Sequence, residues 1–273
     1  MTYTPFPVFH TCVEAVTQLS PHIIRITLAG PQLRNYAAHG LDQRMKIVLE
    51  LPEGGYGDFG ILDDPPPGLN QWYAKWRMLP ADQRNTIRTF TASGIRPAQE
   101  EIDIDFVVHT PGGPASQWAQ QATPGDRLLV VGPDSRAEDS TGGIDFRPGA
   151  AKRILLVGDE TAFPAIRNIL TKSQPETQYH VFLASEMVQD AQTVQQTGPN
   201  QYMHRVTPAD GQLAVDIHEW ALAQQPATPG FYAWIAGESG VVKQLRRLLV
   251  NDHHVPREAI TFSGYWKRGR AEH

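Results

Sequence analysis

Hydrophobic and polar residues alternate with a period of two in the first half of the chain. Three segments show this alternation, at residues 24–28, 45–50 and 102–109. A period of two places one row of side chains in a core and leaves the other row open, as in a β-strand. Several such strands, separated by turns that contain glycine and proline, favour an antiparallel barrel.

A long segment, Pro52–Ile87, separates the second of these strands from the third and is rich in glycine and proline. Connections of this length usually have a function or are mobile. Within it, Gln71–Met78 carries three aromatic residues, and we predict a short helix there.

The pattern changes in the second half, where short apolar runs alternate with segments of helical spacing. Arg153–Val157 is such a run, followed by the turn Gly158–Thr161 and the helical pattern of Phe163–Leu170. The run Tyr232–Ala236 leads into a second predicted helix that extends to about Val250. Alternating strands and helices indicate a parallel α/β sheet.

The two patterns meet in a polar segment with several glycines, Asp134–Gly149, which we interpret as a domain boundary. We therefore predict a two-domain β + α/β protein, with a barrel domain over residues 1–140 and an α/β domain over residues 150–273. A length of 273 residues is comfortable for two such cores.

Composition narrows the class of protein. The net charge of −5 argues against a general nucleic-acid binder. The single cysteine, Cys12, can form no internal disulfide and hold no iron–sulfur cluster, which fits a reducing compartment. The first ten residues lack a basic start followed by an apolar run, and no stretch approaches 18 apolar residues, so we expect neither a signal peptide nor a transmembrane helix. We expect a cytoplasmic protein that does not insert into membranes.

The first candidate for chemistry is the segment Arg88-Thr89-Phe90-Thr91. An arginine offers a planar set of donors that suits phosphate. An aromatic ring two residues later can lie against a flat ligand, and the threonine can donate to a ring nitrogen or oxygen. Taken alone, the segment is also compatible with an ordinary strand that carries a surface arginine.

The second candidate combines the strand Asp105–His109 with the following Gly112–Trp118. Alternation places Asp105, Val107 and His109 on one face of the strand. The glycines permit close approach of a ligand to the backbone. The N–H groups of a helix that begins near Pro114 are suited to a pyrophosphate. A glycine-rich hairpin with a capped helix is the alternative interpretation.

In this order, the motifs resemble the ferredoxin–NADP reductase superfamily and, within it, the siderophore-interacting protein family. The resemblance extends over nearly the whole chain. Its most specific parts are the block from His109 to Trp118 and the stretch Gly264-Tyr-Trp266. The turn Gly158–Thr161, with the following Ala-Phe-Pro-Ala165, agrees with the same family, and so does Trp234–Glu238.

The resemblance implies a six-stranded antiparallel FAD-binding barrel followed by a nicotinamide-nucleotide-type domain. It implies an FAD-dependent oxidoreductase that reduces Fe(III) in siderophores to Fe(II) and releases iron in the cytoplasm. The cofactor-binding residues that it implies are Arg88, Thr89, Phe90, Thr91, Asp105, Phe106, Val107, His109, Gly113, Ala115, Ser116, Thr161, Tyr265 and Trp266.

The chain departs from the family pattern at two places. Phe90 stands where a tyrosine is more common, so one hydroxyl is absent. Asp134-Ser135 stand where an arginine–glycine pair is expected, and Arg136 is the nearest residue that can replace the missing charge.

Many ferric siderophores are anionic, so we expect a locally basic substrate site even in an acidic protein. The candidates are Lys46, Lys267, Arg268 and Arg270, the last three following Trp266 directly. A solvated basic tail is the alternative for those three. We expect NAD(P)H or a ferredoxin as the electron donor. Lys243, Arg246 and Arg247 either meet this donor or belong to an ordinary amphipathic helix.

The ten histidines are scattered along the chain, and we expect no metal bound by the protein. Because a flavin performs the electron transfer itself, we assign no catalytic acid or base. We expect a monomer. Two other functions stay open at this point, a general flavin electron-transfer reductase of the ferredoxin–NAD(P)H type and a siderophore-binding protein without catalysis.

Overall fold

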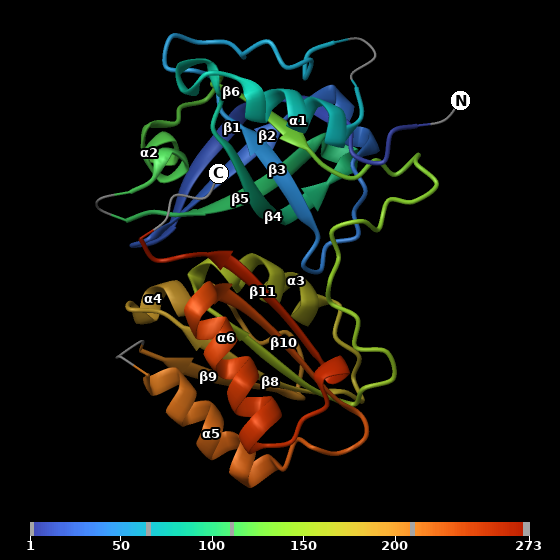
Figure 1. The fold of residues 1–273 in the computed structure, drawn as a ribbon, viewed down its shortest axis with the longest axis vertical. Helices are drawn as coiled ribbons and strands as arrows, with labels where there is room; N and C mark the ends of the chain where they lie inside the picture. Colours follow the sequence, from blue (N-terminus) through green and yellow to red (C-terminus); the bar gives the residue numbers. More distant parts are fainter. Residues whose placement is uncertain (1–2, 64–66, 110–111, 208–210, 270–273) are drawn as a thin grey trace. The chain divides into compact units, whose positions relative to one another are not determined.

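The computed structural model describes residues 3–63, 67–109, 112–207 and 211–269. The chain divides into two compact units (Figure 1). The first comprises the residues up to Gln18 and Ile24–Ile144. The second comprises Leu19–Ile23 and the chain from Asp145 onward.

The first unit is a closed barrel with the strand order β1-β2-β5-β4-β3-β6. Its strands are β1 (Val8–Ser20), β2 (Ile23–Ala29), β3 (Arg44–Val48), β4 (Ile87–Arg96), β5 (Glu101–Val107) and β6 (Arg127–Val131). Its α-helices are α1 (Leu69–Met78) and α2 (Pro114–Gln121), and its 3-10 helices are Pro31–Asn35, Ala81–Gln83 and Pro97–Gln99. The predicted antiparallel barrel and the predicted short helix are both confirmed.

Two apolar clusters stabilise this unit. Alternating side chains of all six strands fill the barrel interior, with Ile26, Leu28 and Ile104 fully buried. A second cluster lies between the outer surface of the barrel and α1, whose Trp72 and Trp76 are almost completely buried. The long connection between β3 and β4 therefore folds against the barrel.

Strand β5 departs from the predicted alternation, because both of its faces are buried. The polar face carries Asp103 and Asp105, each 5% exposed. Two arginines cover it, since Arg25 binds Asp105 and Arg96 binds Asp103. Because each carboxylate is paired with an arginine, Asp103 and Asp105 are buried on a face that the sequence pattern predicts to be open.

The second unit is a parallel sheet with the order β11-β10-β7-β8-β9. Its strands are β7 (Arg153–Gly158), β8 (Gln178–Ala184), β9 (Gln201–Val206), β10 (Phe231–Glu238) and β11 (Ile260–Trp266). Its helices are α3 (Phe163–Thr171), α4 (Val188–Ala191), α5 (Gln212–Gln224) and α6 (Ser239–Arg247), with 3-10 turns at Glu160–Ala162 and Arg257–Ala259 and a π-helical turn at Leu248–Asp252.

Helices α5 and α6 cover one face of this sheet (Figure 1). Their apolar residues Leu213, Ile217, Val242 and Leu245, together with Leu249 of the π-helical turn, pack on alternate residues of the central strands. The parallel α/β prediction is confirmed. Within the described ranges, none of the helices combines the length and the apolar character that crossing a bilayer requires.

Candidate functional site

The cofactor candidates on β4 are divided between two faces of the barrel wall. Register pairs Phe90 with Met45, and Phe90 packs against the interior cluster. Register pairs Thr89 with Lys46, and the Lys46 ammonium donates to the Thr89 hydroxyl over 3.2 Å. Because side chains alternate along a strand, Arg88 lies on the side of Phe90, and Thr91 lies on the side of Thr89.

The side chain of Arg88 is half-buried, and one of its terminal nitrogens donates to the backbone oxygen of Ile87 over 2.8 Å. The ring of Phe90 lies 4.7 Å from that of Phe106, measured between centroids. Phe106 in turn lies 5.6 Å from Trp118 of α2. These rings connect β4, β5 and α2 into one aromatic row.

The candidates on β5 differ in surroundings. The carboxylate of Asp105 binds Arg25, and Phe106 is buried inside the barrel at 1% exposure. Val107 is half-buried, and His109, just beyond the strand, is exposed. His109 donates its backbone N–H to the hydroxyl of Ser116 over 3.3 Å, which ties the strand end to α2.

The start of α2 has the features of a phosphate site. The residue before the helix is Gly113, which has no side chain to cap the first N–H groups, and the space beside its α-carbon is open. Pro114 has no N–H, so Ala115 and Ser116 present the first amides of the helix. A β-carbon at Gly112 would lie 2.8 Å from the backbone oxygen of His109 and 2.6 Å from the Ser116 hydroxyl, so this position requires glycine.

The candidates of the second unit gather at the carboxyl ends of its strands. Thr161 follows β7, and Tyr265 and Trp266 end β11. Lys267 and Arg268 follow at once and are exposed, and the backbone N–H of Arg268 donates to Glu238 over 3.2 Å. Arg270 lies outside the described residues.

The sequence did not single out Asp159, which joins these strand ends. Its carboxylate accepts hydrogen bonds from the Thr161 hydroxyl, the Glu238 amide and the Trp266 indole, at 2.5, 2.8 and 2.8 Å. Burial raises the pKa of the Asp159 carboxyl. Burial also raises the pKa of the neighbouring Glu160 carboxyl. The sequence contains one signal for a role of Asp159. This residue directly follows a buried strand and stands two residues before a threonine, a spacing that caps a helical turn.

Arg136 does not supply an uncompensated charge. Its guanidinium binds both carboxylate oxygens of Asp134, at 3.0 and 2.7 Å, and lies over the ring of Tyr3. Although burial alone would raise it, the pKa of Asp134 is lowered by this arginine. Asp134, which stands where an arginine was expected, therefore binds the arginine that was expected to replace the missing charge.

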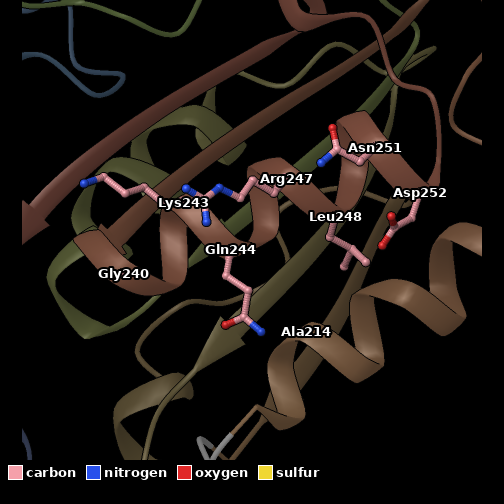
Figure 2. Close-up of a pocket in the computed structure, with 8 residues that line it drawn as sticks. All are labelled: Ala214, Gly240, Lys243, Gln244, Arg247, Leu248, Asn251 and Asp252. Atoms are coloured by element: carbon pink, nitrogen blue, oxygen red, sulfur yellow. The ribbon is translucent and has the colours of Figure 1, made fainter.

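Helices α5 and α6 border a groove of about 470 Å³ (Figure 2). Lys243 and Arg247 are exposed on one wall, one helical turn apart. Arg246, in contrast, lies over the ring of Phe262, 4.5 Å from its centroid. The lining residues are Ala214, Gly240, Lys243, Gln244, Arg247, Leu248, Asn251 and Asp252.

Two family models match consecutive parts of the chain. The siderophore-interacting FAD-binding domain matches residues 12–137, and the siderophore-interacting protein domain matches residues 151–269. An uncharacterized protein of Mycobacterium tuberculosis is 30% identical over 275 residues, which cover 95% of this chain and 90% of the relative. The chain belongs to the siderophore-interacting protein family. Its barrel is the FAD-binding domain of this family.

Two further relatives illustrate the range of the siderophore-interacting protein family. Ferric vibriobactin reductase ViuB of Vibrio cholerae is 27% identical over 257 residues, with 93% of this chain and 87% of the relative covered. The crystal structure of the siderophore-interacting protein SipS from Aeromonas hydrophila superposes with a TM-score of 0.74 at 27% identity, covering 97% of this chain and 94% of SipS.

FAD fits the residues of the barrel. A dinucleotide needs donors for a pyrophosphate and a surface for a flat ring, and α2 presents an uncapped N-terminus beside two glycines. Phe90 supplies an aromatic ring, although the hydroxyl of the more common tyrosine is absent. Among the described residues, no group of three His, Cys, Asp or Glu side chains is arranged to hold a metal ion.

Proposed function

We propose that this protein is a ferric-siderophore reductase that reduces Fe(III) in a siderophore to Fe(II) through bound FAD and thereby releases iron in the cytoplasm. The observation that carries the proposal is the match of both family domains in order along the chain. The relative from Vibrio cholerae, named for this activity, covers 93% of the chain. We assign the FAD-binding barrel to residues 1–140 and the nicotinamide-nucleotide-type domain to residues 150–273.

The chemistry follows from the preference of iron for its ligands. Siderophores hold Fe(III) through hard oxygen donors, and Fe(II) binds such donors far more weakly. When bound, FAD accepts a hydride or electrons and passes them on one at a time. The amides at the start of α2 would hold its pyrophosphate, Arg88 would add a charge-assisted contact, and Phe90 would pack against the flavin. The protein contributes binding and orientation.

Capture of an anionic ferric chelate is assigned to four basic residues. Lys46 lies on the barrel wall beside Thr89, and its ammonium is 5.4 Å from the centroid of the Tyr73 ring. Lys267 and Arg268 are exposed at the end of β11, with Arg270 two residues later. These charges raise the local concentration of an anion in a protein whose net charge is −5.

The electron donor is NAD(P)H or a ferredoxin. The exposed Lys243 and Arg247 beside the groove of Figure 2 suit either an anionic nucleotide or an acidic protein. We further propose that the protein works as a monomer.

An anaerobic turnover assay with an Fe(II) trap tests the proposal. The purified protein should be yellow, and after reduction it should transfer electrons to a ferric siderophore, with trapped Fe(II) formed in proportion. A yellow protein that reduces a ferredoxin or a dye but no ferric chelate would be a general flavin reductase. A colourless protein that only binds the chelate would have no reductase function.

A further inference from the structure

One carboxylate, that of Asp159, joins the ends of three neighbouring strands of the second unit. It follows β7, and its two oxygens have separate sets of donors. One oxygen accepts from the amide and the hydroxyl of Thr161. The other accepts from the Glu238 amide at the end of β10 and from the Trp266 indole at the end of β11, both at 2.8 Å.

Two backbone features permit the contact between Trp266 and Asp159. Strands β10 and β11 shift register between Gly237 and Glu238, so that Trp266 rather than Tyr265 lies opposite Glu238. Such an extra residue re-aims a side chain and is rare between parallel strands. A β-carbon at Gly237, whose φ is 139°, would lie 2.4 Å from the Asp159 carboxylate, so only glycine leaves room for it.

Further hydrogen bonds continue from Trp266 to the basic residues. The Ser239 hydroxyl donates to the Trp266 carbonyl over 2.8 Å. Glu238 accepts from the Arg268 amide with one oxygen and from the amides of Gly240 and Val241 with the other. The Trp266 side chain and the backbone on either side of Lys267 are therefore held by hydrogen bonds, although Lys267 and Arg268 themselves are exposed.

Strand cohesion alone does not require a carboxylate here. Burial raises the pKa of the Asp159 carboxyl, so desolvating its charge is unfavourable. A charged acceptor, however, forms shorter and stronger hydrogen bonds than a neutral one and fixes the orientation of an indole donor. Such a group is expected where a side chain must be held in one place.

We infer that Asp159 is a positioning residue that fixes the Trp266 indole and, through it, the Lys267–Arg268 segment for capture of an anionic ferric chelate. The capture of a ferric chelate rests on the proposed function, whereas the fixing of the indole does not. Asp159 acts through the residues that it positions, and the proposed role requires no contact of Asp159 with iron or flavin.

The decisive variant is Asp159→Asn in the full-length, FAD-loaded protein. An amide has a single acceptor oxygen, so one of the two pairs of donors loses its acceptor. The indole N–H resonance of Trp266, identified among six tryptophans by its loss in Trp266→Phe, should shift and exchange faster with solvent. The Kd for ferric citrate should rise three- to tenfold, while the Kd for a neutral tris-hydroxamate ferric chelate stays within twofold.

Asp139→Asn is the matched control. Asp139 accepts from the amide and hydroxyl of Thr141, as Asp159 does from Thr161, but it has no tryptophan donor in its turn. It should leave the indole resonance and both Kd values unchanged. In a Lys267→Ala/Arg268→Ala background, Asp159→Asn should weaken ferric citrate binding by less than twofold, because the residues that it positions are absent.

An unchanged Trp266 resonance in Asp159→Asn, or an equal loss of affinity for both chelates, would overturn the inference. If that variant does not fold, Trp266→Phe decides, since it removes one donor and retains the carboxylate. It should weaken ferric citrate binding alone, and unchanged binding would refute the inference. A wild-type protein that binds ferric citrate without reducing it would contradict the proposed function and leave the positioning role intact.

Discussion

Arg25 binds both carboxylate oxygens of Asp105, with nitrogen–oxygen distances of 2.8 and 3.1 Å. The sequence indicated Asp105 as a cofactor residue on an open face of its strand. In the structure its side chain is almost completely buried against the arginine, next to the Asp103–Arg96 pair. This geometry favours a structural role for Asp105, as the partner of Arg25, over a direct contact with FAD.

The first prediction concerns this pair. Asp105→Asn should lower the free energy of unfolding by about 1–3 kcal/mol, because a charge-assisted, partly buried contact is lost. The FAD content of the protein that remains folded should stay near that of the wild type. Urea unfolding combined with flavin absorbance measures both quantities. Arg25→Gln should have a similar effect, and the double variant should cost less than the sum of the two. A loss of FAD without a loss of stability would return Asp105 to the cofactor site.

The second prediction concerns Arg88. Arg88→Ala should weaken FAD binding by about 1.5–3 kcal/mol, on the order of a 10- to 100-fold rise in Kd, because a charged contact to phosphate is removed. Titration of the apoprotein with FAD, followed by quenching of flavin fluorescence, gives the Kd. Arg127→Ala, at an exposed arginine of β6, is the control and should bind FAD normally. Equal affinities in the two variants would exclude Arg88 from the site.

The third prediction concerns acid stability. His180 packs among Tyr202, Trp220 and His204, and burial lowers its pKa to about 4. Its Nδ1 atom has no hydrogen-bond partner among the residues that the structure describes. In the unfolded chain its pKa returns to about 6.5. Between these two values the unfolded state binds a proton that the folded state does not. Stability should therefore fall as the pH drops from about 6.5 to 4, by up to about 3 kcal/mol.

His180→Phe should flatten this dependence, because phenylalanine keeps the ring packing and cannot take up a proton. The measurement is urea unfolding at a series of pH values, compared with the wild type and with His10→Gln at an exposed histidine. A pH dependence that persists unchanged in His180→Phe would show that other groups cause it.

The parts of the fold that sequence predicted are those with local causes. Period-two alternation is sufficient for β2 and for the barrel class, and aromatic spacing is sufficient for α1. Strand β9 was not predicted, because its residues alternate poorly in hydrophobicity and only its ends are buried. Its place at the edge of the sheet depends on pairing with β8.

The candidate site shows the same division. A glycine-led helix that follows a strand is a local feature, and Gly113 and Ser116 lie where the motif indicated. The contact between Asp159 and Trp266 joins residues 107 positions apart. It depends on the register shift between β10 and β11, which no local pattern contains. Likewise, the neutralisation of Arg136 by Asp134 is visible only in the folded loop.

The last prediction concerns the charges assigned to substrate capture. Lys46→Ala and Lys267→Ala should each raise KM for an anionic ferric siderophore a few-fold and leave the FAD content normal. A partly exposed charge contributes roughly 0.5–1 kcal/mol to such an attraction, so the double variant should lose about tenfold. Added salt should raise the KM of the wild type and reduce its advantage over the variants, because screening acts on the same attraction.

Two controls separate this attraction from a general loss of activity. A neutral ferric chelate should be reduced equally well by the wild type and the variants, and Lys172→Ala, at another exposed lysine of the second unit, should behave as the wild type. If both variants reduce anionic and neutral chelates as the wild type does, neither lysine takes part in capture, and the residues after Trp266 are a solvated tail.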